Sequence, residues 1–300
     1  MAIPVSHFWQ QRTSDLGGLR ELALLAELRA QLPLPVRRAR MCSDGVPRHL
    51  YKYRSLASDE SKQRLTGMLL ANELFASAVN KLNDPFDSTA AYDLDEDGVG
   101  LRESVKSFFI SEGADSELAA ALSNDESVSD PKLLAQSLKQ GHRSLLEQVG
   151  ICALSAERRN NVLWSHYGQE HRGVAIQYRP SLDPVAFQVS QVQYSDAYPV
   201  VRSYFNRGAR NLLAPLLQKS ADWKYESEWR LICPGAANRA LKVRPESITG
   251  VLLGMRISAS DRAFLLDLVT RRDRLLSTRT FVYQATATPG AYTVRTTRIL

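Results

Sequence analysis

The chain has 300 residues, of which 44% are hydrophobic and 23% are charged. This balance is typical of a globular protein with a sizeable core. No stretch approaches the ~20 consecutive apolar residues of a membrane-spanning helix. The first residues lack the basic start and apolar block of a Sec-type signal peptide. We therefore expect a cytoplasmic protein that does not act at a membrane, although secretion by a non-Sec route would leave no such trace.

The three cysteines show no C-x-x-C spacing, and the five histidines are scattered along the chain. Both observations argue against a disulfide framework and against a metal centre. Lys and Arg number 38 and Asp and Glu 32, which gives a net charge of +6. A basic surface favours polyanions such as nucleic acid, but the same excess can simply keep a protein soluble.

The predicted elements begin with an amphipathic helix over residues 18–32, followed by a basic, Pro-rich connector. Residues 1–46 are accordingly interpreted as an N-terminal appendage, and residues 47–300 as a single α+β domain. Within this domain, 49–56 reads as a strand, and Ser58 or Asp59 can cap a helix that follows.

A helical insertion is predicted over about 99–149. From residue 150 onward, short apolar strands such as "GICALS" and "GVAIQY" follow one another with few helices between them. This pattern predicts an α+β fold with a mixed, largely antiparallel sheet.

The stretch "WKYESEWRL", residues 223–231, alternates large apolar with charged residues, which is typical of a strand. As a strand it would place Glu226 and Glu228 on one face, and Trp223, Tyr225 and Trp229 on the other. Such a strand can be an ordinary charged surface strand. It can also bring together two carboxylates for chemistry on a glycosidic bond, which proceeds through an oxocarbenium-like state.

Other polar and aromatic positions also allow two interpretations. In "NDPFD", Asn83 and Asp84 can form a structural turn or contact ribose hydroxyls. Trp164 and Tyr167 share one face of a short helix, where they can pack in the core or stack on a ligand. Arg158 can contact a phosphate or remain solvated.

The motifs "LYKYRSL", "NDPFD", "WSHYGQEHRGVAIQY" and "WKYESEWRL", in that order, resemble those of a widespread bacterial family known only as a domain of unknown function. The resemblance covers about residues 49–298, and its specific feature is the combination of W-x-x-x-G-x-x-x-x-G-V-A-I with W-x-x-E-x-E-W-R.

The order of these motifs is also similar to that of the ADP-ribosyltransferase superfamily. This resemblance implies a split, largely antiparallel sheet and NAD as a substrate. It also implies mono-ADP-ribosyl transfer to a macromolecular acceptor, a protein or a nucleic acid, by a toxin, effector or phage-defence protein. Glu228 would then be the catalytic glutamate, Glu226 would orient the acceptor, and Ser155 would belong to the second motif.

The first motif of that superfamily would fall on Tyr51, Lys52, Tyr53 and Arg54, where this sequence has Y-K-Y-R instead of an unambiguous Arg or His. Under the same resemblance, three cations are candidates to hold the pyrophosphate of NAD: Lys52, Arg54 and Arg158. Three aromatic residues are candidates to stack on nicotinamide: Tyr53, Trp164 and Tyr167. Two alternatives stay open: a non-catalytic nucleic-acid-binding module, and a glycohydrolase that consumes NAD or nucleosides.

Overall fold

The computed structural model describes residues 45–93, 98–111, 114–124, 130, 132–133, 136, 140, 143–144, 146–202 and 214–300. The predicted helix over 18–32 therefore lies outside the described residues. The described chain divides into two compact units. Unit 1 contains residues of 78–149 and 195–220, and unit 2 contains 45–77, 150–194 and 221–300. Because unit 2 is assembled from three segments, its sheet depends on contacts between residues far apart in sequence.

Unit 1 is built mainly from short elements. The helices α4 (Gly98–Ser111) and α5 (Ser116–Ser123) contact each other, and Asp115 caps α5 by accepting from the Leu118 amide at 2.8 Å. The strand β3 (Ala91–Asp93) pairs in parallel with β8 (Val200–Arg202). The remaining short elements are η1 (Val79–Lys81), η3 (Ala214–Leu217) and β9 (Gln218–Ser220).

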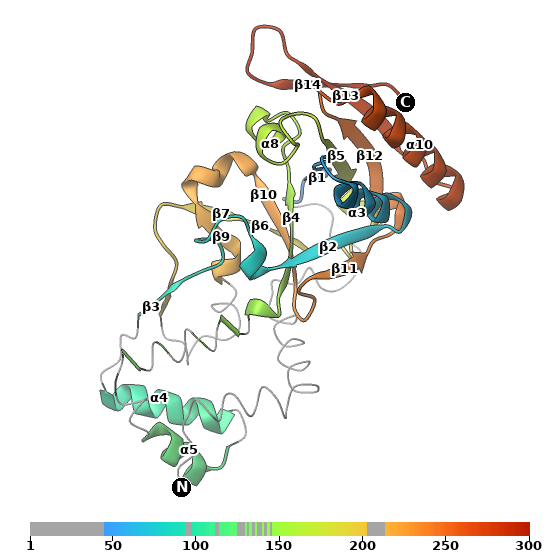
Figure 1. The fold of residues 1–300 in the computed structure, drawn as a ribbon. Helices are drawn as coiled ribbons and strands as arrows, with labels where there is room; N and C mark the ends of the chain where they lie inside the picture. Colours follow the sequence, from blue (N-terminus) through green and yellow to red (C-terminus); the bar gives the residue numbers. More distant parts are fainter. Residues whose placement is uncertain are drawn as a thin grey trace. The chain divides into compact units, whose positions relative to one another are not determined.

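Unit 2 contains the main sheet (Figure 1). Along its main path the strand order is β11 (Arg239–Lys242), β2 (Glu73–Ala78), β4 (Gly150–Ser155), β1 (Leu50–Arg54), β5 (Val174–Tyr178), β12 (Ile248–Leu253), β13 (Phe281–Ala287) and β14 (Val294–Arg298). Off this path, β10 (Glu228–Cys233) pairs with β4 and with β6 (Val189–Gln191). The pairing is mostly antiparallel. The strands β12 and β13 are parallel and are joined by the long helix α10 (Ala259–Leu276). The prediction of an α+β fold with a mixed, mostly antiparallel sheet is confirmed.

The two faces of this sheet carry different side chains. On one face, α3 (Asp59–Leu70) and α10 cover an apolar core, to which both helices and seven strands contribute. On the other face, the short helix α8 (Asn161–His166) inserts Leu163 and Trp164 against Tyr51, Tyr53 and neighbouring small residues. Ser58 begins α3 by accepting from the Ser61 amide at 3.1 Å, so the predicted cap is confirmed.

The two edges of β4 pair differently. Along one edge, β4 pairs with β10 at all six residues, from Gly150 to Ser155. Along the other edge, the neighbouring strands β1 and β2 diverge. On that edge, β1 meets β4 at Ser155, which pairs with Tyr51, and β2 is the other neighbour. Beyond that pair the Lys52 ammonium donates to the Ala153 carbonyl at 2.6 Å, so a side chain replaces the strand pairing there.

The predicted strand over residues 223–231 is only partly correct. Ala221–Glu226 forms the 3-10 helix η4, and β10 begins at Glu228. Between them, Ser227 adopts a left-handed conformation with φ 45° and donates to the Lys224 carbonyl at 3.2 Å. Alternation of apolar and charged residues does not reveal this turn, because a 3-10 helix also buries some positions and exposes others. Glu226 and Glu228 therefore belong to different elements and do not share a strand face.

The remaining elements of unit 2 are short. They are η2 (Pro180–Leu182), η5 (Pro245–Ser247) and most of β7 (Gln193–Ser195). Within the described ranges, every helix is too short or too polar to cross a lipid bilayer.

Candidate active site

One row of polar side chains crosses the α8 face of the main sheet at a single register. In this row Glu228 of β10 pairs with Ser155 of β4, which pairs with Tyr51 of β1, which pairs with Gln177 of β5. All four side chains are buried, with at most 6% of each residue exposed. Because residues opposite each other in paired strands point to the same face, the row is a continuous polar strip over four strands.

Glu228 forms a buried ion pair at one end of the row. Arg230 donates from Nε to Glu228 Oε1 at 2.7 Å and from Nη2 to Oε2 at 3.0 Å, and the Arg230 side chain is only 1% exposed. This forked geometry fixes the carboxylate plane and keeps Glu228 ionised. The Glu228 amide donates to the hydroxyl of Tyr194 at 2.8 Å, which anchors the start of β10.

Glu226 lies at the end of η4 and is 5% exposed. Tyr167, which follows α8, donates its hydroxyl to Glu226 Oε1 at 2.5 Å. The Ser155 hydroxyl donates to the Glu226 backbone carbonyl at 2.6 Å. Ser155 thus links the two glutamates: it pairs with Glu228 in the sheet and holds the main chain of Glu226.

The other end of the row is enclosed by polar groups. Tyr51 Oη donates to Gln177 Oε1 at 3.3 Å, and Gln177 Nε2 donates to Thr249 Oγ1 at 2.9 Å. Gly250 of β12 is the next residue in the register. A Cβ on Gly250 would lie 3.1 Å from the Tyr283 ring and 3.4 Å from Gln177 Nε2, so glycine leaves room for this amide.

The first predicted motif divides between the two faces of β1. Tyr51 and Tyr53 lie on the α8 face with the polar row, whereas Lys52 and Arg54 alternate to the face covered by α3. Burial lowers the pKa of Lys52, and the charges of Cys152 and Glu228 partly oppose this effect. Burial likewise lowers the pKa of Arg54, whose Nε lies 3.4 Å from Met68 Sδ. The two tyrosines are therefore the residues of this motif that accompany Glu228.

Of the three cations predicted to hold a pyrophosphate, Arg158 is the one whose charge acts on Tyr51 of the polar row. Burial raises the pKa of Tyr51, and the adjacent positive charge of Arg158 opposes that rise. Tyr53 is anchored elsewhere, because its hydroxyl donates to the Glu157 carbonyl at 2.7 Å. Burial raises its pKa far above the usual range, so this phenol stays protonated.

Trp164 belongs to the core. It is fully buried, donates from Nε1 to the Arg158 carbonyl at 2.9 Å, and packs edge-on against Tyr53 with ring centroids 5.1 Å apart. Its ring is therefore not available to stack on a ligand. After α8 the left-handed conformations fall on Gln169, Glu170 and His171, which have positive φ, and not on Gly168. Gly168 is required because a Cβ there would lie 2.8 Å from the Trp164 ring.

Asn83 and Asp84 belong to unit 1 and the polar row to unit 2. Asp84 Oδ1 accepts from the Phe86 amide at 2.9 Å, which is the turn that the sequence "NDPFD" predicts. Asn83 and Asp84 are therefore not counted among the residues of the polar row, all of which belong to unit 2.

Sequence reasoning did not assign Arg230, Tyr194 or Gln177 to the site. The i, i+2 spacing of Glu228 and Arg230 in a strand could have indicated their pairing. Tyr194 and Gln177 reach the row through tertiary contacts, for which the sequence carries no local signal.

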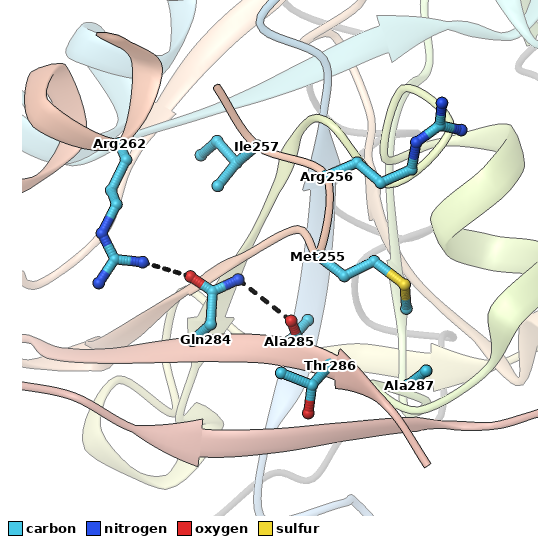
Figure 2. Close-up of a pocket in the computed structure, with 8 residues that line it drawn as sticks. All are labelled: Met255, Arg256, Ile257, Arg262, Gln284, Ala285, Thr286 and Ala287. Atoms are coloured by element: carbon cyan, nitrogen blue, oxygen red, sulfur yellow. Dashed lines mark hydrogen bonds between the residues drawn. The ribbon is translucent and has the colours of Figure 1, made fainter. Parts of the chain in front are cut away.

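A hollow of about 580 Å³ lies beside β13, apart from the polar row (Figure 2). Its floor includes Met255, Ile257 and Ala285, and at its edge Arg262 donates to Gln284 Oε1 at 2.5 Å. None of the predicted site residues lines it. Within the described residues, no group of three or more His, Cys, Asp and Glu side chains could hold a metal ion.

Together, the structure defines an α+β protein whose mostly antiparallel sheet carries a buried Glu–Arg pair and a second buried glutamate. The model of a family described as "Protein of unknown function (DUF2971)" matches residues 163–231. This segment runs from α8 into β10. It contains Tyr167 and Tyr194 and the charged residues Glu226, Glu228 and Arg230. No curated protein and no solved structure matches the chain.

Proposed function

We propose that unit 2 is an NAD-dependent mono-ADP-ribosyltransferase acting on a macromolecular acceptor, in which Glu228 stabilises a ribosyl oxocarbenium. The observation that carries this proposal is the polar row, which combines the ionised carboxylate of Glu228 with Ser155 and Tyr51 across adjacent strands. The order of the sequence motifs, similar to that of the ADP-ribosyltransferase superfamily, supports the same assignment.

In this reaction the bond between ribose C1′ and the nicotinamide nitrogen breaks, and its electron pair leaves with nicotinamide. The positive charge that remains on the ribosyl group needs a fixed negative charge nearby. Glu228 can provide this charge, because its two hydrogen bonds from Arg230 hold the carboxylate in one orientation. The acceptor nucleophile then adds to C1′ and loses a proton.

We assign Glu226 as the base that accepts the proton of the acceptor nucleophile. Its carboxylate receives a hydrogen bond from Tyr167, which fixes its position near the end of η4. A carboxylate that holds a tyrosine hydroxyl can orient an acceptor hydroxyl or amide in the same way. The acceptor's proton would pass to Glu226 and from there to solvent.

The test is nicotinamide release from NAD by wild type and by Glu228→Gln, with and without cell lysate. Glu228→Gln is nearly isosteric but leaves the buried Arg230 without its counter-charge, so circular dichroism and urea denaturation first establish that the variant is folded. For the folded variant we expect release to fall by about a hundredfold or more. Glu60→Gln on α3, which neutralises a carboxylate that is 72% exposed, serves as the control and should retain activity. Release that is unchanged in Glu228→Gln would disprove the assignment. Release without labelling of any acceptor would identify a glycohydrolase.

A second candidate is a non-catalytic module that binds nucleic acid. It is favoured by the burial of both glutamates, each engaged by a protein donor, and by the net charge of +6. In this case Glu228 stabilises the fold only. Affinity for an oligonucleotide would then fall steeply with salt and would not depend on Glu228.

A further inference from the structure

Three arginines and a histidine gather where β1 begins and β5 ends. Leu50 of β1 pairs with Tyr178 of β5 in an antiparallel register. In this register the next residues outward are His49 and Arg179, which therefore lie side by side beyond the paired strands. We call the following residues the cation cluster: Arg48, His49, Arg158 and Arg179.

The positive charges of three arginines act on His49. Burial is the largest cause that lowers the pKa of His49, and the charges of Arg48, Arg179 and Arg158 follow as further causes. Each of the three guanidinium groups is thus close enough to disfavour an imidazolium at position 49. Arg158 also lies beside Tyr51, which ties the cluster to the polar row.

Little within the described residues neutralises this charge. None of the three arginines forms an ion pair with a carboxylate there, and Arg179 Nε donates to the neutral Ser181 hydroxyl at 3.2 Å. Glu157 precedes Arg158 and is exposed; its charge acts on Tyr51 but is not among the causes that act on His49. Positive groups held this close are stabilised by an anion that bridges them.

The cluster lies on the face of the sheet that carries Glu228. Side chains alternate along β1 and β5, so His49 and Arg179 point to the same side as Tyr51 and Gln177. Tyr51 is separated from Glu228 by two strand spacings, about 10 Å. The charge of Arg158 acts on both His49 of the cluster and Tyr51 of the row, which suits an extended ligand with its anionic part over the cluster.

We propose that the cation cluster is the binding site for a diphosphate group. Arginine guanidinium groups bind phosphate oxygens in forked pairs, and an imidazole adds a further N–H donor. The identity of the ligand as NAD rests on the proposed function, whereas the affinity for diphosphate does not. The ribosyl end of the bound nucleotide would extend along the row towards Glu228.

The experiment is calorimetric titration of the full chain with inorganic pyrophosphate, ADP and NAD. The test variant is Arg158→Gln/Arg179→Gln, and Arg271→Gln/Arg274→Gln on α10 removes the same charge as a control. We expect the test variant to lose tenfold to about a hundredfold in affinity for pyrophosphate, and the control to stay within about twofold of wild type. Equal affinity of wild type and test variant, or no binding of pyrophosphate to wild type, would overturn the proposal.

Two further measurements test the diphosphate site without relying on a folded variant or on turnover. Saturating pyrophosphate should raise the pKa of His49, followed by NMR, because the anion stabilises the imidazolium; an unchanged pKa would count against the site. If wild type binds pyrophosphate through the cluster but fails to release nicotinamide from NAD, the proposed function fails and the diphosphate site stands.

A single-stranded oligonucleotide provides the third arm. Binding of the oligonucleotide that depends on the cluster, together with no binding of pyrophosphate or ADP, would overturn the proposal in favour of a nucleic-acid backbone.

Discussion

The two faces of the main sheet are held together in different ways. The face under α3 and α10 is an apolar core in which buried Leu, Ile and Val side chains predominate. The face under α8 carries buried charges, hydroxyl groups and an amide, which depend on specific partners. Apolar contacts tolerate replacement by similar volumes, whereas a buried charge tolerates no loss of its partner. We therefore expect substitutions on the apolar face to leave the polar row intact, and substitutions of the charged residues on the α8 face to disrupt it.

The largest expected effect is on the α8 face. Arg230→Met leaves the Glu228 carboxylate buried without its guanidinium, so the free energy of unfolding should fall by about 3–5 kcal/mol. The double variant Glu228→Gln/Arg230→Met should recover part of this loss, because it removes the buried charge. Urea denaturation measures both. A loss below about 1 kcal/mol in the single variant would mean that the pair does not stabilise this face.

The apolar face should respond to a cavity instead. Leu268→Ala in α10 removes a side chain that is 1% exposed and packs in the core, which should cost about 2–5 kcal/mol. Ligand binding and turnover per folded molecule should be unchanged, since α10 covers the face of the sheet opposite to the polar row. A strong loss of pyrophosphate affinity in the folded variant would show that the faces are coupled.

A smaller effect is expected when one hydrogen bond to a charge is removed. Tyr167→Phe deletes the donor to Glu226 and should lower the free energy of unfolding by about 1.5–3 kcal/mol. Tyr292→Phe, at a fully exposed position, is the matched control and should be neutral. If the two variants unfold at the same urea concentration, the Tyr167–Glu226 bond contributes no net stability.

The smallest effect concerns pH. The pKa of His49 is lowered by burial and then by nearby arginines, and that of His171 by burial and then by Arg256. An unfolded histidine has a pKa of about 6.5, so below that pH the unfolded chain binds more protons than the folded one. Stability should therefore decline as pH falls through about 6.5 towards the folded values.

Both histidines are partly exposed, so solvent screening should keep this effect below about 1 kcal/mol. Thermal unfolding at pH 7.5 and 5.5 measures the decline. His49→Gln should show a smaller decline than wild type, and an identical decline would exclude His49 as a contributor.

Much of the fold could be predicted from local patterns. The apolar runs of β4 and β5 and the Ser58 cap of α3 are signals of local backbone preference, and the structure confirms them. The turn at Ser227 was missed because a left-handed serine has no sequence signature, unlike a glycine.

The candidate site was predictable only in part. Glu226 and Glu228 stand out as charges within an aromatic segment, but their partners do not. Gln177 and Tyr194 look like ordinary strand residues until β5 and β7 are placed in three dimensions. The cation cluster likewise arises from pairing of β1 with β5, which no local pattern encodes.

The position of β1 has a consequence for how the chain folds. Tyr51 bonds to Gln177, 126 residues later, and β5 in turn requires β12 as its other neighbour. Such a topology has a high contact order, because long loops must close before the central pairing forms. During synthesis β1 emerges early and has to await strands made much later. Until β4 and β5 have been made, both edges of β1 are unpaired, and an unpaired strand in a nascent chain is prone to aggregate unless a chaperone covers it.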